Sequence, residues 1–290
     1  MLPRYPETTE LTLELRTLLH PLFQQLHEGI SEFTFANLYL FRQHHHYALS
    51  VLADTTMVIL GRDNDAPFFM LPFGLPEQPL LDQLFYDHGL MKCASRGQAE
   101  VLAARGYSMQ ADRDNFDYLY RRQDLAELGG RNYHKKRNLI KAFVNSHTYT
   151  ALPLREEYCQ DALRILEDWQ TEAQQRGDYD AAREGLEKME ELQLCGGIYY
   201  VEARPVAYVL GEEQARSASF VIQFEKAVSG YKGLYQFINQ SFAAILPDIY
   251  DTINREQDLG EEGLRHAKLS YKPTGFVEKF IMYPPAEPPV

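Results

Sequence analysis

The sequence predicts an α+β protein in two domains, residues 1–150 and 151–290, each with short strands between amphipathic helices. A chain of 290 residues suits one large or two ordinary domains. Short apolar runs bounded by turn clusters alternate with segments of helical periodicity in both halves. No repeat is visible in the residues themselves, so one interleaved domain stays an alternative.

In the first half, apolar residues recur at helical spacing between positions 15 and 26. Pro21 interrupts this pattern, and we expect it to begin a second helical piece. Residues 31–42 predict a short, buried, aromatic helix. The other helices expected here are 77–89, 97–105 and 123–146, the last with a break at Gly129-Gly130. The expected strands are 47–53, 56–60, 67–71, 91–95, 106–110 and 115–120.

The second half of the sequence also predicts helices alternating with short strands. Leu163, Leu166 and Trp169 mark the core face of one helix. The expected helices are 156–176, 179–192, 234–246 and 261–269. The expected strands are a hairpin of 196–203 and 205–210, then 218–224, 249–253 and 275–282.

The chain is acidic, with a formal net charge of −12, which argues against non-specific binding to nucleic acid or anionic membranes. One segment breaks this trend, because residues 131–141 contain five cations and no acid. We expect these cations to form the strongest positive patch: Arg131, Lys135, Lys136, Arg137 and Lys141. They form either the solvated face of a helix or a docking surface for a polyanion such as RNA.

Further sequence features predict where in the cell the protein is found and whether it binds a metal. No apolar run reaches the length of a membrane-spanning helix, and no secretory signal is visible at the N-terminus. The three cysteines are scattered, which predicts a reducing, cytoplasmic location. His44, His45 and His46 are consecutive and cannot all face one ion, so we predict no metal site.

A loop that opens a helix is the first candidate for binding. Gly230 and Gly233 bracket Lys232 after an expected strand, and glycines permit close backbone approach. The free N–H groups at the start of the next helix suit a phosphate. The alternative is an ordinary strand-to-helix turn.

Charged residues end two neighbouring strands. Glu225-Lys226 closes one strand, and Asn254 to Asp258 follows the next. If the strands are adjacent and parallel, both ends meet at one edge, where open sheets bind ligands. Grouped carboxylates there supply a general base. The alternatives are a surface ion pair for Glu225-Lys226 and a helix cap for Asp258; Glu256 stays open.

Lys268 lies near the end of the expected helix 261–269. A cation at a helix C-terminus commonly serves the helix dipole, which is the alternative to a role in catalysis.

Together these segments resemble stand-alone relatives of the C-terminal domain of phosphatidylglycerol lysyltransferase. The matching pieces are SEFTFANLY (31–39), GRNYHKKRNLI (130–140), FEKA (224–227), GLYQFIN (233–239), NREQDLGEEGLR (254–265) and AKLSYKP (267–273). The resemblance implies two tandem GNAT-like acyltransferase domains, each a mixed, mostly antiparallel sheet flanked by helices. Residues 228–233 only approximate the coenzyme A motif of that fold.

The resemblance also implies an activity. We expect an aminoacyl- or acyltransferase with its site in the C-terminal half. Aminoacyl-tRNA or acyl-CoA is the expected donor, the acceptor is an amine or hydroxyl, and no cofactor is tightly bound. The alternative is a non-catalytic binding or scaffold protein with a degenerate acyltransferase fold. The candidate catalytic residues are Glu225, Glu256 and Lys268. The candidate donor-binding residues are Lys226, Gly230, Lys232, Gly233 and Asn254, with RNA bound through the cations of 131–141.

Overall fold

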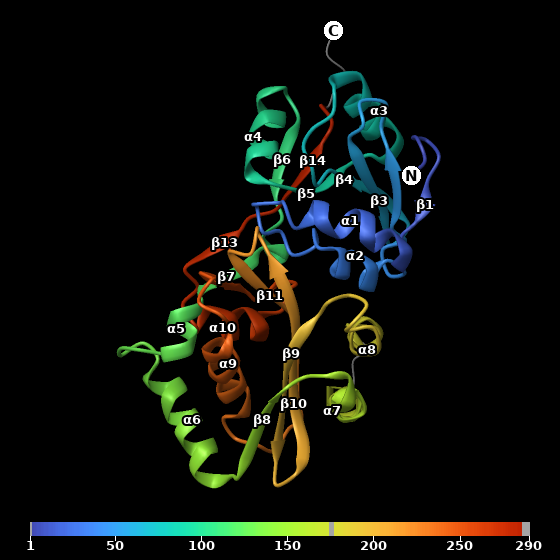
Figure 1. Cartoon of the computed structure of the whole chain (residues 1–290). Helices are drawn as coiled ribbons and strands as arrows, with labels where there is room; N and C mark the ends of the chain where they lie inside the picture. Colours follow the sequence, from blue (N-terminus) through green and yellow to red (C-terminus); the bar gives the residue numbers. More distant parts are fainter. Residues whose placement is uncertain (1, 174–176, 286–290) are drawn as a thin grey trace. The chain divides into compact units, whose positions relative to one another are not determined.

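The computed structural model describes residues 2–173 and 177–285, and the chain separates into two compact units (Figure 1). Unit 1 contains the chain up to Asp117, Gln257–Glu262 and the described residues from Phe276 onward. Unit 2 contains Tyr118–Glu256 and Gly263–Gly275. The boundary expected near residue 150 lies inside unit 2, because the helices that precede it pack against a helix of that unit.

Unit 1 is built on a seven-stranded sheet of order β1-β2-β3-β4-β5-β14-β6. Its strands are β1 (Thr9–Glu10), β2 (Ala48–Val51), β3 (Met57–Asp63), β4 (Ala66–Met70), β5 (Met91–Ala94), β6 (Ser108–Ala111) and β14 (Phe280–Tyr283). Its helices are η1 (Leu13–Leu15), α1 (Arg16–Phe23), α2 (Phe35–Phe41), α3 (Gln78–His88), α4 (Arg96–Ala104) and η2 (Arg113–Asn115). Its core includes Phe69, Leu81, Leu84, Met91, Leu102 and Met282.

The second sheet also has seven strands, in the order β13-β7-β12-β11-β10-β9-β8. Its strands are β7 (Asp117–Arg121), β8 (Tyr149–Pro153), β9 (Cys195–Val201), β10 (Arg204–Gln214), β11 (Ser219–Ala227), β12 (Thr252–Asn254) and β13 (Gly275–Val277). The helices of this part of the chain are α5 (Arg122–Glu127), α6 (His134–Ser146), η3 (Glu156–Tyr158), α7 (Cys159–Ala173), α8 (Tyr179–Glu187), α9 (Leu234–Ile245) and α10 (Glu262–Leu269).

Both units follow one order of elements, which the residues alone did not reveal. When the short 3-10 helices η1 and η3 are left out, each unit has a strand, two α-helices, three strands, a helix, a strand, a helix and a strand, from β1 to β6 and again from β8 to β13. Each sheet has a parallel pair, β4 with β5 and β11 with β12, among antiparallel neighbours. The α+β class with two mixed, mostly antiparallel sheets flanked by helices is therefore confirmed.

The expected strand 275–282 is in fact two strands in different sheets. β13 lies at the edge of the second sheet, whereas β14 lies between β5 and β6 in the first. Glu278 and Lys279 separate them. The apolar run predicted extended backbone correctly, but a run of apolar residues does not record a change of sheet.

The expectation for Pro21 was wrong, because Pro21 lies inside α1. The helix has only eight residues, so the missing N–H of proline frees a carbonyl in the first turn.

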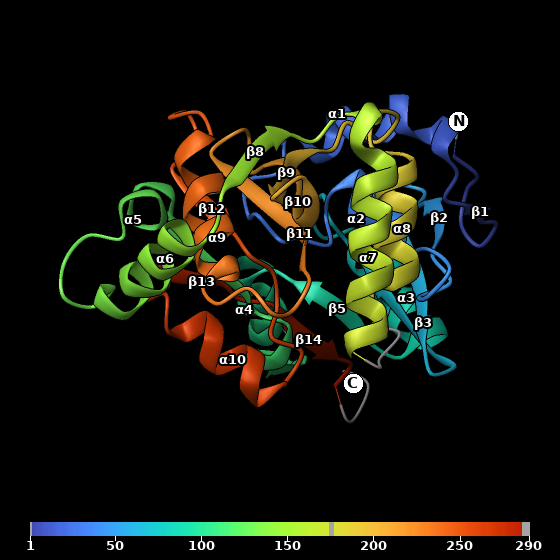
Figure 2. The same ribbon diagram turned by 90° about the horizontal axis from the view of Figure 1, so that it is seen from below.

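Helices cover both faces of the strands in unit 2. Figures 1 and 2 show α7 and α8 on one face of β9–β11 and α6 and α9 on the other. The side chains of β11 alternate accordingly, since neighbours on a strand point to opposite faces. Glu225 contacts Arg255 after β12, whereas Lys226 contacts Asp178 before α8.

Gly233, which begins α9, is required by close packing. Its φ is +89°, and a Cβ there would lie 2.1 Å from the carbonyl oxygen of Leu139 in α6. Gly230 has a similar φ of +91° with nothing within 4 Å of its Cβ position. We expect Gly233→Ala to lower the free energy of unfolding by about 1–3 kcal/mol more than Gly230→Ala, because only the first change overpacks. Chemical denaturation of both variants measures this difference, and equal losses would contradict it.

Candidate functional site

The ends of β11 and β12 bring the predicted carboxylate and amide segments together in unit 2. The two strands are parallel neighbours, with Val221 opposite Asn254. Beyond that pair, Arg255 Nη2 donates to Glu225 Oε1 at 2.9 Å, and the two side chains are only 14% and 11% exposed. The structure therefore brings Glu225 against the segment that follows β12 through the Arg255 side chain, although β11 continues to Ala227, past the end of β12.

Arg255 is the residue that the sequence analysis missed. The Asn239 amide oxygen, in the orientation that satisfies both partners, accepts from Arg255 Nη2 at 3.1 Å. The Tyr271 ring lies 5.5 Å from the guanidinium carbon. Burial lowers the pKa of Arg255, but Glu225, Tyr120 and Tyr271 together raise it above its usual value. Arg255 is thus a fixed buried cation. The sequence feature that could have identified Arg255 is that it is the one cation between Asn254 and Asp258.

The two carboxylate oxygens of Glu225 differ, because only one of them has a hydrogen-bond partner among the described residues. Oε1 takes the Arg255 hydrogen bond, whereas Oε2 is buried and has no hydrogen-bond partner among the described residues. A buried carboxylate oxygen is costly without a donor. The geometry therefore suits an N–H or O–H donated by a ligand, which is the contact that a general base makes.

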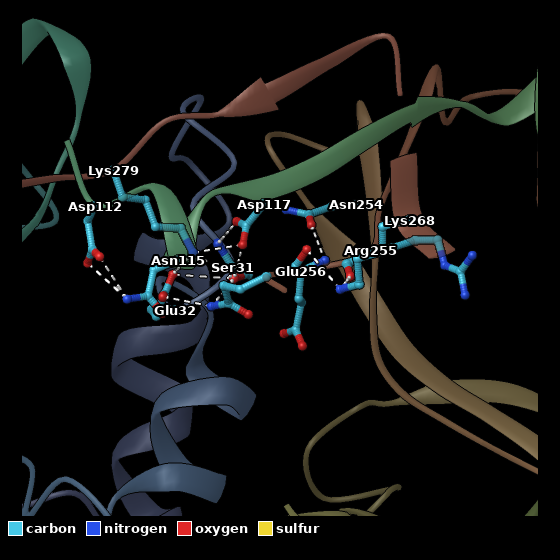
Figure 3. Close-up of polar contacts among 11 residues, drawn as sticks. Ser31, Glu32, Asp112, Asn115, Asp117, Asn254, Arg255, Glu256, Lys268 and Lys279 are labelled. Atoms are coloured by element: carbon cyan, nitrogen blue, oxygen red, sulfur yellow. Dashed lines mark hydrogen bonds and ion pairs between the residues drawn. The ribbon is translucent and has the colours of Figure 1, made fainter. Parts of the chain in front are cut away.

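Asn254 shapes the loop rather than facing outward. It is fully buried, and its Oδ1 accepts from the backbone N–H of Glu256 at 2.7 Å. This side-chain turn holds Glu256 at a φ of +53°. Figure 3 shows the Asn254 amide directed at the Glu256 backbone.

Lys268 of α10 is tied to the same loop. Its Nζ donates to the carbonyl oxygens of Arg255 at 2.6 Å and Glu256 at 3.1 Å. Lys268 therefore satisfies backbone groups at the end of β12 and fixes the segment that carries Arg255.

Replacing Lys268 tests this tether. Lys268→Met should lower the free energy of unfolding by about 1.5–3 kcal/mol, because charged hydrogen bonds to two carbonyls are lost. A helix-dipole contact alone would cost only about 0.3–1 kcal/mol. Denaturation midpoints measure the loss, with Lys272→Met as the control, since Lys272 is exposed. A loss no larger than the control's would contradict the tether.

The predicted phosphate loop is occupied by other groups. The Ser229 N–H donates to the Glu172 carboxylate of α7 at 2.8 Å. Lys226 is buried; its Nζ contacts Asp178 Oδ1 at 2.6 Å and lies 3.7 Å from the Trp169 ring. Lys232 is exposed. A carboxylate thus lies where a donor's diphosphate was expected.

The basic segment divides into two groups. Lys136 turns toward the candidate site, where its Nζ donates to Ser270 Oγ at 2.7 Å and lies 3.8 Å from the Tyr271 ring. Burial and, second, the charge of Arg255 lower the pKa of Lys136. Burial also raises the pKa of Tyr271 to about 12. Arg131, Lys135 and Arg137 instead line one hollow, and Lys141 is exposed further along α6.

A second polar cluster lies inside unit 1, and the sequence analysis gave its members no role. Lys279 is fully buried and contacts Glu32 Oε2 at 2.5 Å and Asp117 Oδ1 at 2.7 Å. Ser31 Oγ also donates to Asp117, and Gln257 Nε2 donates to Glu32 Oε1, both at 2.9 Å. Figure 3 shows Lys279 extending toward this group. The cluster joins distant parts of the chain through one buried cation.

Asp258 also lies in unit 1 and caps a turn. Its Oδ1 accepts from the Gly260 N–H at 2.9 Å, and Oδ2 contacts Arg113 at 3.2 Å. Among the described residues, no group of three His, Cys, Asp or Glu side chains is placed to hold a metal ion. Within the same residues, no helix has both the length and the apolarity to cross a bilayer.

Residues 23–283 match the family described as "Phosphatidylglycerol lysyltransferase, C-terminal". The chain belongs to that family. In this member of the phosphatidylglycerol lysyltransferase C-terminal family, the Glu225–Arg255 pair lies between β11 and the segment after β12. No curated protein matches the sequence.

Solved structures support the family fold. A conserved protein of unknown function from Bacteroides thetaiotaomicron is 30% identical, with a TM-score of 0.87 over 98% of this chain and 99% of that one. The C-terminal domain assigned to a lysylphosphatidylglycerol synthetase of Agrobacterium fabrum has 11% identity and a TM-score of 0.65, covering 94% and 92%. L-PGS from Bacillus licheniformis has 12% identity and a TM-score of 0.59, covering 87% and 92%. The last two likenesses concern the fold alone.

Proposed function

We propose that this chain is an aminoacyltransferase that moves the aminoacyl group of an aminoacyl-tRNA to an amine or hydroxyl acceptor. The observation that carries the proposal is the buried Glu225 carboxylate, which is held by Arg255 and has no hydrogen-bond partner at Oε2 among the described residues. The family supports transfer chemistry, and its name points to a lysyl donor and a phosphatidylglycerol acceptor. The reaction belongs in the cytoplasm, where charged tRNA is available.

The proposed step needs one base and no metal. The acceptor N–H or O–H donates to Glu225 Oε2, and the acceptor atom attacks the ester carbonyl carbon. The tetrahedral intermediate collapses with cleavage of the ester bond, and Glu225 returns the proton to the departing ribose oxygen. Arg255 holds the Glu225 carboxylate through a hydrogen-bonded ion pair, and Lys268 positions the segment that carries Arg255. Glu256 presents its backbone to Lys268, so its carboxylate is a weaker candidate for the base.

Two contacts favour an RNA ester over coenzyme A as the donor. Glu172 takes the Ser229 amide in the loop where a diphosphate would bind, and like charges would repel there. The cations Arg131 and Lys135 offer an RNA contact on α6.

The test is transfer from radiolabelled aminoacyl-tRNAs to phosphatidylglycerol vesicles and to small amines. Glu225→Gln should slow transfer by about 100- to 10,000-fold. Glu190→Gln, an exposed change in the same unit, should leave the rate unaltered. Transfer from acyl-CoA but not from aminoacyl-tRNA would show that the donor is acyl-CoA and would contradict the proposed donor. Binding of charged tRNA without transfer to any acceptor would favour the scaffold alternative.

A further inference from the structure

A hollow at the start of α6 is lined by polar and cationic residues, which expose mostly their apolar atoms to it. Its volume is about 450 Å³, and its lining consists of Gly130, Arg131, Asn132, His134, Lys135 and Arg137. Small-molecule sites fall in the range of about 300–1,000 Å³. The hollow is therefore larger than a lone phosphate needs and large enough for a nucleotide.

The cations at this hollow are not neutralised by the protein. Arg131 and Lys135 are exposed, and their side chains have no hydrogen-bond or ion-pair partner among the described residues. Elsewhere in unit 2, surface cations pair with acids one turn away, as Arg183 does with Glu187 at 3.0 Å and Arg164 with Asp161 at 3.0 Å. Residues 131–141 contain no acid that could do the same.

Their position adds an electrostatic cost. His134 and Lys135 occupy the first turn of α6, where the helix has no acidic residue and no side-chain cap. A helix N-terminus carries partial positive charge, so cations there destabilise it and anions stabilise it. A bound anion would meet free N–H groups and unpaired side chains together.

Arg137 gives the hollow a fixed wall. Its guanidinium donates to the carbonyl oxygen of Gly130 at 2.7 Å and also to that of Leu128. These bonds hold the glycine loop against the helix, so Arg131 and Lys135 project from an ordered frame.

We propose that this hollow is a nucleotide-phosphate site, in which Arg131 and Lys135 bind the phosphate and the remaining space takes the nucleoside. The nucleotide is either free or the phosphorylated end of an RNA strand. Only the RNA source rests on the proposed function. Binding is measured without any transfer step, so the site and the transfer chemistry can fail separately.

The experiment is a calorimetric titration of the whole chain with 5′-AMP and adenosine, and with one short single-stranded RNA in 5′-phosphorylated and 5′-hydroxyl forms. We expect the phosphorylated member of at least one pair to bind about tenfold more tightly, because it gains charge-assisted hydrogen bonds. Arg131→Ala combined with Lys135→Ala should remove that advantage.

The control carries the same loss of charge outside the hollow. Arg155→Ala combined with Lys272→Ala changes two exposed cations and should preserve the preference for phosphate. A preference in the AMP pair supports a site for free nucleotides, and a preference in the RNA pair alone supports an RNA end. No preference in either pair, or equal weakening by the control variant, overturns the site.

Discussion

Lys279→Met should lower the free energy of unfolding by about 3–5 kcal/mol, because it leaves two carboxylates without their buried cation. Lys279 and Asp117 are fully buried, and Glu32 is 15% exposed. Methionine keeps most of the length of lysine, so the loss reflects charge rather than a cavity. Denaturant unfolding at neutral pH measures it.

The loss should depend on pH. Burial alone would raise the pKa of Glu32, but the Lys279 ammonium outweighs it, and the pKa lies below its usual value. Glu32 therefore contributes stability that is present above its unfolded pKa and is lost as the pH falls through the folded pKa. Lys279 has a raised pKa despite burial, because Asp117 and Glu32 favour its charge. Its contribution persists below the unfolded pKa of about 10.4 and fades only in stronger alkali.

The difference between wild type and Lys279→Met should consequently be largest near neutrality and shrink on acidification, where protonated Glu32 needs no cation. Adding Glu32→Gln to Lys279→Met should recover part of the loss at neutral pH. An unchanged unfolding midpoint for Lys279→Met, or a loss that grows in acid, would refute the electrostatic explanation.

Arg255→Met should also cost about 3–5 kcal/mol, and under the proposed function it should abolish transfer. The change leaves the Glu225 carboxylate buried and without its cation. The Glu225 carboxylate would then also lose the hydrogen bond that fixes its position. Unfolding midpoints and single-turnover rates on one preparation measure both effects.

A double variant separates the two effects. Arg255→Met with Glu225→Gln should regain much of the stability but none of the transfer rate. The surface pair Arg122–Asp248 supplies a control, since Asp248 is 94% exposed. Asp248→Asn should cost less than about 1 kcal/mol. If Arg255→Met costs no more than Asp248→Asn, the centre is not a buried ion pair.

Local sequence patterns predicted many of the helices and strands. Helical spacing predicted α3 and α7, and alternation with turn residues predicted β9 and β10. Pro21 was misjudged because eight residues of helix tolerate a proline that a longer helix would not. The sequence also predicted that Glu225 lies near the segment after β12, because these two strands are parallel neighbours.

The roles of the site residues were harder to predict. Asn254 and Lys268 were found as residues, but their contacts to the backbone of Glu256 were not. Such contacts depend on which carbonyl lies within reach, and sequence spacing does not specify that. Gly233 was predicted to admit a phosphate, whereas the structure gives it a packing contact with Leu139.

The sequence by itself determined the α+β class, most helices and strands, and the acid-free segment 131–141, because periodicity and charge are properties of neighbouring residues. Only the tertiary structure decided that β14 joins the first sheet, that Arg255 pairs with Glu225, and that Lys279 joins Ser31 across 248 positions of the chain. The reason is physical: a buried cation is stable only beside carboxylates that the fold brings to it, and those partners are distant in sequence.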